Sequence, residues 1–137
     1  MQKSHMMQKP RQASQACFGK RILLIDPDEI NYELHHFQLK KFKIKLEYTK
    51  SLRHALWLIQ ENPPDLILTE IYFNGHLHYE HLFSLRQEML TPIIVQSSQS
   101  AAHHAENCRI RGAKAYFRKP LQWDEYTKAI LYCLENS

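Results

Sequence analysis

The chain has 137 residues, 44% of them hydrophobic and 23% charged, and it contains three glycines, six prolines and three cysteines. This length fits one domain with a sizeable core and excludes a repeat array or a multidomain enzyme. The net charge is +4, but Lys3, Lys9 and Arg11 in the first 19 residues supply most of it. A nearly neutral body is poor evidence for a nucleic-acid-binding surface, and we expect no direct nucleic-acid partner.

The small number of glycines and cysteines excludes several kinds of site. The glycines lie too far apart for a phosphate-binding loop, and the cysteines form no CxxC pair. No apolar run approaches the roughly 18 residues that a membrane span needs, and the N-terminus has no signal-peptide pattern. We therefore expect a cytoplasmic protein that has no contact with a membrane.

Residues 1–19 are polar and lack periodicity, so they are expected to be a disordered tail, partly derived from cloning, before one domain over residues 20–137. Apolar runs and amphipathic stretches then alternate. In chain order the predicted elements are strand Arg21–Ile25, helix Glu29–Lys41, strand Lys43–Tyr48, helix Leu52–Glu61, strand Asp65–Ile71, helix Leu77–Met89, strand Pro92–Gln96, helix Ala101–Arg111, strand Ala115–Phe117 and helix Trp123–Glu135.

This alternation predicts an α/β fold in three layers, a doubly wound five-stranded parallel sheet with helices on both faces. Right-handed crossovers with helices on both faces require the strand order to reverse once. The common solution is the flavodoxin-like order 2-1-3-4-5. Ligands of such folds bind outside the carboxyl ends of the strands, at the point of reversal.

Polar residues follow four of the predicted strands. Asp26 and Asp28 follow the first strand, Glu70 ends the third, Ser97 follows the fourth and Lys119 follows the fifth. Each has an ordinary explanation alone, because an aspartate can cap a helix and a serine can be a loop residue. Together they predict a cleft in which carboxylates, a hydroxyl group and an amine meet.

Four motifs resemble the receiver domain of bacterial response regulators, the CheY-like family. They are RILLID, PPDLILTE, TPIIVQSS and GAKAYFRKP, and the resemblance covers about Lys20 to Asn136. It implies a domain, not an enzyme, in which an aspartate at the end of strand three accepts a phosphoryl group from a histidine kinase with Mg²⁺. It also implies switch roles for Ser97 and Tyr116, pairing of Lys119 with the phosphoryl group, and a cis peptide bond between Lys119 and Pro120.

The chain departs from this family at the reacting centre. Glu70 stands at the phosphoacceptor position, and its extra methylene displaces the carboxylate from the geometry that transfer requires. Pro27 replaces a metal ligand, so Asp26 and Asp28 are expected to form a weak or lost Mg²⁺ site, and no other cofactor is expected. These departures favour signalling through protein–protein contacts without phosphorylation, with Glu70 as a partial mimic of the phosphorylated state.

Two alternatives remain open: a functional Mg²⁺-dependent phosphoacceptor in a phosphorelay, and a flavodoxin-like enzyme. Expected partners are a histidine kinase, an effector domain beyond this chain, or a protein or second copy that binds the face of the fourth helix, fifth strand and fifth helix. The aromatic residues near that face either belong to an interface or complete the core; they are Tyr116, Trp123, Tyr126 and Tyr132.

Overall fold

The computed structural model describes residues 15–88, 90–99 and 102–136. Its five main strands are β1 (Arg21–Ile25), β2 (Lys45–Thr49), β3 (Leu66–Thr69), β6 (Ile93–Ser97) and β7 (Ala115–Arg118). Its helices are α2 (Glu29–Leu39), the 3₁₀ turn η1 (Lys40–Phe42), α3 (Leu52–Glu61), α4 (Tyr79–Glu88), α5 (Ala102–Ile110) and α6 (Trp123–Glu135). Two short strands, β4 (Tyr72–Phe73) and β5 (His76–Leu77), lie between β3 and α4.

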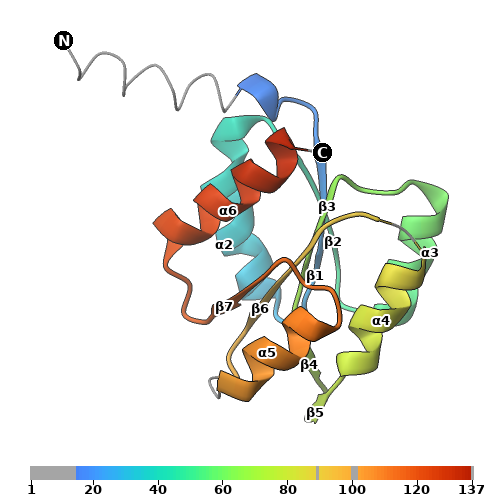
Figure 1. Ribbon diagram of the computed structural model, residues 1–137. Helices are drawn as coiled ribbons and strands as arrows, with labels where there is room; N and C mark the ends of the chain where they lie inside the picture. Colours follow the sequence, from blue (N-terminus) through green and yellow to red (C-terminus); the bar gives the residue numbers. More distant parts are fainter. Residues whose placement is uncertain (1–14, 89, 100–101, 137) are drawn as a thin grey trace.

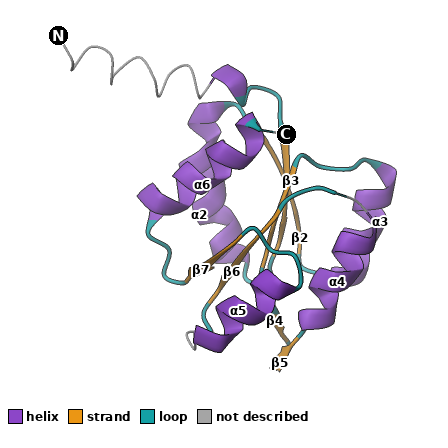
Figure 2. Cartoon of the chain, in the orientation of Figure 1, coloured by secondary structure: helices purple, strands orange, loops and turns teal. Residues whose placement is uncertain are grey.

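The main sheet confirms the predicted topology. Its strands are all parallel and run in the order β2-β1-β3-β6-β7, so β6 and β7 are the fourth and fifth strands of the predicted 2-1-3-4-5 arrangement. Helices α2 and α6 cover one face, and α3, α4 and α5 cover the other (Figure 1). Figure 2 shows the strands enclosed between these two helical layers.

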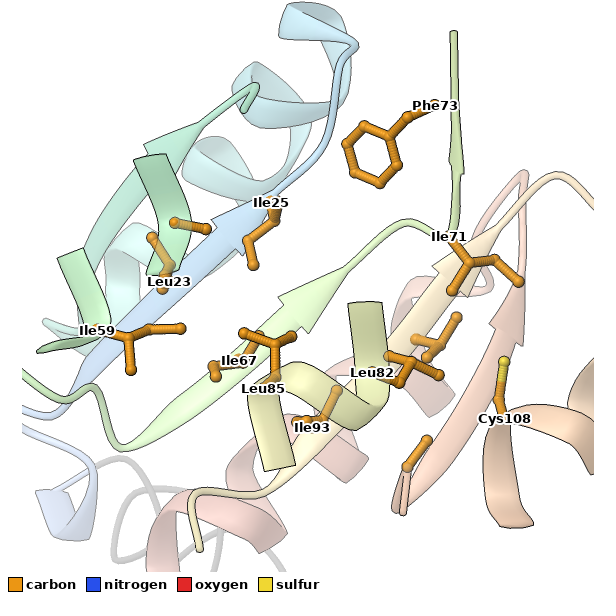
Figure 3. Packing of buried hydrophobic residues seen from close by; sticks show 13 residues of the cluster. Leu23, Ile25, Ile59, Ile67, Ile71, Phe73, Leu82, Leu85, Ile93 and Cys108 are labelled. Atoms are coloured by element: carbon orange, nitrogen blue, oxygen red, sulfur yellow. The ribbon is translucent and has the colours of Figure 1, made fainter. Parts of the chain in front are cut away.

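The central strands β1, β3 and β6 are buried on both faces, which explains their apolar sequences, whereas the edge strands β2 and β7 are only partly buried. Leu23 and Ile25 of β1 pack with α3, α4 and α5 in one cluster (Figure 3). Ile22 and Leu24 alternate with them and join α2 and α6 in a second cluster. Period-two alternation therefore divides one apolar run between two cores.

Helix α2 turns its polar side toward the sheet. Asn31 and His35 are buried, whereas Ile30 and Phe37, two large apolar residues of the same helix, are 70% and 65% exposed. The buried polar groups are satisfied by hydrogen bonds to Asp26, Gln96 and Tyr126, which offset the cost of burying them. The orientation of α2 is therefore set by polar contacts rather than by its hydrophobic stripe.

The loop after β3 contains a hairpin that the predicted elements lack. Strands β4 and β5 are antiparallel, with Tyr72 opposite Leu77 and Phe73 opposite His76. Asn74 and Gly75 form the turn with φ angles of 52° and 80°. Two consecutive positive φ angles are characteristic of a type I′ turn, for which Asn-Gly is the favoured sequence.

The N-terminal part of the chain differs from the expected disordered tail where it is described. Residues 1–14 of that tail lie outside the described residues, but Cys17 is fully buried in the cluster beneath α2 and α6. The thiol Sγ donates to the carbonyl oxygen of Leu131, and the amide of Gly19 donates to the carbonyl oxygen of Lys43. Residues 15–19 therefore pack against the domain. None of the described helices is long and apolar enough to cross a membrane.

Candidate functional site

Asp26 lies at the carboxyl end of β1 and is fully buried. Its Oδ1 accepts a hydrogen bond from the amide of Asp28 at 2.8 Å. Its Oδ2 accepts from Asn31 Nδ2 at 2.8 Å, from Gln96 Nε2 at 3.1 Å and from Lys119 Nζ at 2.7 Å. The amide of Asn31 also donates to Gln96 Oε1 at 2.8 Å, which closes a ring of three side chains. Both carboxylate oxygens are therefore engaged by the protein itself.

Glu70 follows β3 and is also buried. Its Oε1 accepts from Lys119 Nζ at 2.9 Å. Its Oε2 accepts from the amides of Ile71 at 2.8 Å and Tyr72 at 3.0 Å, so the longer side chain folds back over its own backbone. The carboxylate is thus held by one ammonium group and two peptide N–H groups.

Lys119 joins the two acids. It follows β7 in a cis peptide bond with Pro120, and its Nζ forms ion pairs with both Asp26 and Glu70. Burial lowers the pKa of Lys119, but the charges and hydrogen bonds of Asp26 and Glu70 outweigh this and raise it. The ammonium form is favoured because it faces two carboxylates in a largely desolvated site.

The remaining acid after β1 points elsewhere. Asp28 is exposed, and its Oδ1 accepts from the amide of Ile30 at 2.9 Å, so it caps helix α2. This capping role is one of the two explanations that the sequence offers for Asp28. Pro27 is exposed and has no side-chain oxygen. The second and third positions after β1 therefore send no carboxylate toward Asp26.

These contacts do not fit a magnesium site. Mg²⁺ requires near-octahedral oxygen ligands and keeps several waters, so it needs carboxylate lone pairs that face open space. Asp26 and Glu70 direct most of theirs at N–H groups and an ammonium group, and Oδ1 of Asp26 and Oε1 of Glu70 accept one hydrogen bond each. Every buried side-chain nitrogen and oxygen in the described part of the chain has a hydrogen-bond partner. No orphaned acceptor marks a place for a cation there.

Ser97 and Tyr116 lie beside this cluster but meet at Gln99. The Ser97 hydroxyl is buried and accepts from the amide of Gln99 at 3.2 Å. The Tyr116 hydroxyl donates to the carbonyl oxygen of Gln99. Tyr116 packs against the apolar cluster under α5, and burial raises its pKa to about 12. The two expected switch residues are therefore linked through one loop residue.

The site also contains residues that the sequence analysis did not identify. Asn31 and Gln96 hold Asp26, and His35 supports them from α2. His35 Nδ1 lies 2.7 Å from the carbonyl oxygen of Asn31, and its Nε2 lies 2.7 Å from the Tyr126 hydroxyl. A carbonyl only accepts, so Nδ1 carries the proton and Nε2 accepts from Tyr126. The sequence contains one signal for these residues. Gln96 is polar, yet it directly follows the apolar residues of a strand that is expected to be buried.

The face formed by α5, β7 and α6 holds the four aromatic residues discussed above in different environments. Tyr126 is fully buried and belongs to the core. Trp123 and Tyr116 are partly buried, whereas Tyr132 is 68% exposed. Tyr132 borders a cavity of about 520 Å³ that Phe117 and Ala129 also line. Of these aromatic rings, Tyr132 is the one most available to a partner.

Comparison with solved structures shows the same fold. A two-component response regulator of Clostridium difficile matches with a TM-score of 0.79 and 23% identity, over 84% of this chain and 95% of that one. The receiver domain of a Francisella response regulator matches with a TM-score of 0.78 and 21% identity, over 86% and 98%. The chemotaxis protein CheY4 of Vibrio cholerae matches with a TM-score of 0.75 and 17% identity, over 84% and 98%.

A search of curated protein sequences finds no match. The family model described as "Response regulator receiver domain" matches residues 22–131, which span the sheet from β1 to β7 and most of α6. This match covers most of the chain and includes Asp26, Glu70, Ser97, Tyr116 and Lys119. The chain therefore belongs to the response regulator receiver domain family of two-component signalling proteins.

Proposed function

We propose that this receiver domain signals through protein–protein contacts without phosphorylation of its acidic site. The observation that carries the proposal is that Lys119 contacts both Asp26 and Glu70, while N–H groups engage the rest of both carboxylates. A phosphoryl acceptor needs an available carboxylate oxygen and a cation that neutralises the incoming charge. Here the protein's own N–H groups and the Lys119 ammonium group occupy Glu70, at the phosphoacceptor position, and the neighbouring Asp26.

Glu70 reproduces part of the environment of a phosphorylated acid. Its carboxylate accepts from an ammonium group and from two backbone amides beyond the strand end. It offers one negative charge, compared with about −1.5 to −2 for a phosphoryl group. The Ser97 hydroxyl meanwhile bonds to Gln99. We propose that Glu70 biases the domain toward an active-like state without saturating it, because a full switch of populations takes about 5.5 kcal/mol.

The main alternative is a Mg²⁺-dependent phosphoacceptor. Incubation with acetyl phosphate and Mg²⁺, followed by mass spectrometry of the intact protein, separates the two functions. We expect no stable adduct of about 80 Da, the mass added by one phosphoryl group. An adduct that forms on the wild type and is lost in Glu70→Gln would overturn the proposal. A phosphorylatable receiver domain treated in parallel shows that the reagent is active.

We further propose that the face of α5, β7 and α6 carries the output to an effector domain or another protein. Hydrogen–deuterium exchange tests its link to Glu70. Glu70→Gln removes the charge that pairs with Lys119, directly after β7, so the amides of Tyr116 and Phe117 should exchange faster. Glu61→Gln, an exposed change at the end of α3 and outside this face, is the control. Equal exchange in the wild type and Glu70→Gln would reject coupling between Glu70 and this face.

A further inference from the structure

Helix α2 carries an outward stripe of large apolar side chains. Ile30, Leu34 and Phe37 are spaced at i, i+4 and i+7, and they are 70%, 47% and 65% exposed. Residues with this spacing lie on one side of a helix. Single exposed apolar residues are ordinary, but a continuous stripe on one helix is typical of an interaction surface.

The helix cannot rotate to bury this stripe without breaking internal hydrogen bonds. On the opposite side, the Asn31 amide bonds to Asp26 and Gln96, and the His35 ring bonds to Tyr126. All of these partners are buried. Rotating α2 would leave them unsatisfied, and a buried polar group without a hydrogen-bond partner destabilises the fold. The apolar stripe is therefore held on the outside.

The two ends of the stripe have complementary shapes. At the N-terminal end, Ile30 and Leu34 line a cavity of about 220 Å³ together with Pro120, Leu121 and Trp123. At the other end, Phe37 protrudes, with Lys40 Nζ 5.3 Å from its ring centroid. The separation of seven positions from Ile30 to Phe37 places the projection about 10 Å from the cavity along the helix. A hollow and a projection on one helix can pair with a second copy that runs in the opposite direction.

The charges of α2 have the same self-complementary arrangement. Acidic residues lie at its N-terminal end (Asp28 and Glu33, with Glu29 already paired to Lys50), and basic residues lie at and just after its C-terminal end (Lys40, Lys41 and Lys43). An antiparallel pair of α2 helices places each acidic end beside the basic end of the partner. A parallel pair would place like charges together, which is unfavourable. Charge and shape therefore select the same partner and orientation.

We propose that α2 is a homodimer interface, in which the α2 helices of two copies pack antiparallel around a two-fold axis near Leu34. The Phe37 side chain of each copy enters the cavity between Ile30 and Leu121 of the other. Such an interface is isologous, because each contact occurs twice. It is centred on α2 and meets the face of α5, β7 and α6 only at the edge where Trp123 lines the cavity, and it stands whether or not Glu70 can be phosphorylated.

Sedimentation equilibrium of the full chain over a concentration series tests the interface. We expect a reversible dimer, and Phe37→Ser should raise its dissociation constant by about tenfold or more, because two apolar contacts are lost in each dimer. Phe37 is exposed, so this variant should keep the wild-type circular dichroism spectrum. Trp57→Ser, at an apolar residue of α3 that is 55% exposed, is the matched control. A monomeric wild type, or a dimer that Tyr132→Ser disrupts and Phe37→Ser does not, would overturn the proposal.

Disulfide cross-linking in a Cys133→Ser background tests the orientation. Cys133 is replaced because it is partly exposed, whereas Cys17 and Cys108 are buried. In the antiparallel arrangement, Leu34→Cys should cross-link to itself on mild oxidation, and Ile30→Cys should cross-link to Phe37→Cys when the two proteins are mixed. Disulfides require Cα atoms within about 7 Å, so the reaction is selective for register. Efficient self-cross-linking of Ile30→Cys with none at Leu34→Cys would contradict the two-fold axis.

Discussion

Nζ of Lys119 lies 2.9 Å from Oε1 of Glu70, and it forms a second ion pair with Asp26 at 2.7 Å. One ammonium group thus serves two buried acids at the carboxyl edge of the sheet. The stability of the cluster depends on this cation, because an unpaired buried carboxylate is far more costly than a paired one.

Lys119→Met should destabilise the domain strongly. Methionine keeps much of the side-chain volume but leaves Asp26 and Glu70 without their cation. Breaking a buried ion pair costs about 3–5 kcal/mol, and we expect about 3 kcal/mol because the Lys119 side chain keeps 19% exposure. Urea unfolding at pH 7 measures the loss. Lys114→Met, at an exposed lysine, should change the free energy of unfolding by less than about 0.5 kcal/mol. Equal values for the two variants would contradict the role of Lys119.

Alkaline pH should also weaken the Lys119 contacts. The pKa of Lys119 is raised in the folded state by Asp26 and Glu70 against the opposing effect of burial, so its contribution is complete below the unfolded value of 10.5. This contribution is lost as pH rises through the higher folded pKa. Burial also raises the pKa of Tyr48 and Tyr116 to about 12, so these two tyrosines further reduce the stability of the fold as the pH rises. The wild type should therefore lose more stability than Lys119→Met between pH 9 and 12; parallel curves would refute this.

His35 should make the domain sensitive to acid. Burial lowers its pKa from 6.5 to about 4, so the neutral ring stabilises the fold above pH 6.5, and this contribution is lost as pH falls through 4. A difference of this size corresponds to about 3 kcal/mol. Urea unfolding at several pH values should show a shallower acid loss for His35→Gln than for the wild type. His36→Gln, exposed on the same helix, should retain the wild-type profile. An unchanged acid profile in His35→Gln would refute the assignment to His35.

The fold could be predicted from the sequence because local patterns and chain topology agree. Apolar runs and one alternating stretch, Lys43–Tyr48, mark the strands, and Ser51 accepts from the amide of His54 at the predicted start of α3. The facing of α2 could not be predicted in this way. Periodicity identifies a helix but not which of its sides is buried. In α2 the buried side is set by the hydrogen bonds of Asn31 and His35, which reach Gln96 and Tyr126 far along the sequence. The burial of Cys17 likewise depends on long-range contacts.

The candidate site was predictable in outline only. Strand order brings Asp26, Glu70 and Lys119 to one edge, and the structure places the ammonium group between the two acids. The direction in which each side chain points depends on hydrogen bonds that the spacing of residues along the sequence does not reveal. Glu70 bonds to its own backbone, and Ser97 bonds to Gln99. The Asn74-Gly75 hairpin, in contrast, has a recognisable sequence signal, because Asn-Gly favours a type I′ turn.

The β4–β5 hairpin should depend on Gly75. An added Cβ would meet nothing within 4 Å, but the φ angle of +80° lies in the left-handed region. Gly75→Ala should therefore cost about 1 kcal/mol through backbone strain rather than through a clash. Urea unfolding measures this loss, and hydrogen exchange should show faster exchange from Tyr72 to Leu77. Asn74→Gly is the matched control, because glycine relieves the positive φ of 52° there. Equal destabilisation by both variants would contradict a turn limited by φ.

Restoring the missing carboxylate should create a cation site. Pro27→Asp supplies a second carboxylate beside Asp26. Glu70→Asp shortens the third acidic side chain, which withdraws its carboxylate from the amides of Ile71 and Tyr72. The double variant then holds three acids against one cation, Lys119, which favours a hard divalent ion. We expect calorimetric titration to show Mg²⁺ binding at least about tenfold tighter than in the wild type.

The control for this design is Pro27→Ala with Glu70→Asp, which removes the proline without adding a carboxylate. It should bind Mg²⁺ more weakly than the Asp variant, because it offers two carboxylates instead of three, while Asn31, Gln96 and Lys119 occupy Oδ2 of Asp26 in both. If the wild type already binds Mg²⁺ as tightly as the double variant, the internal donors do not exclude the cation. In that case the side chains around Asp26 and Glu70 rearrange readily, and phosphorylation without new acids becomes chemically accessible.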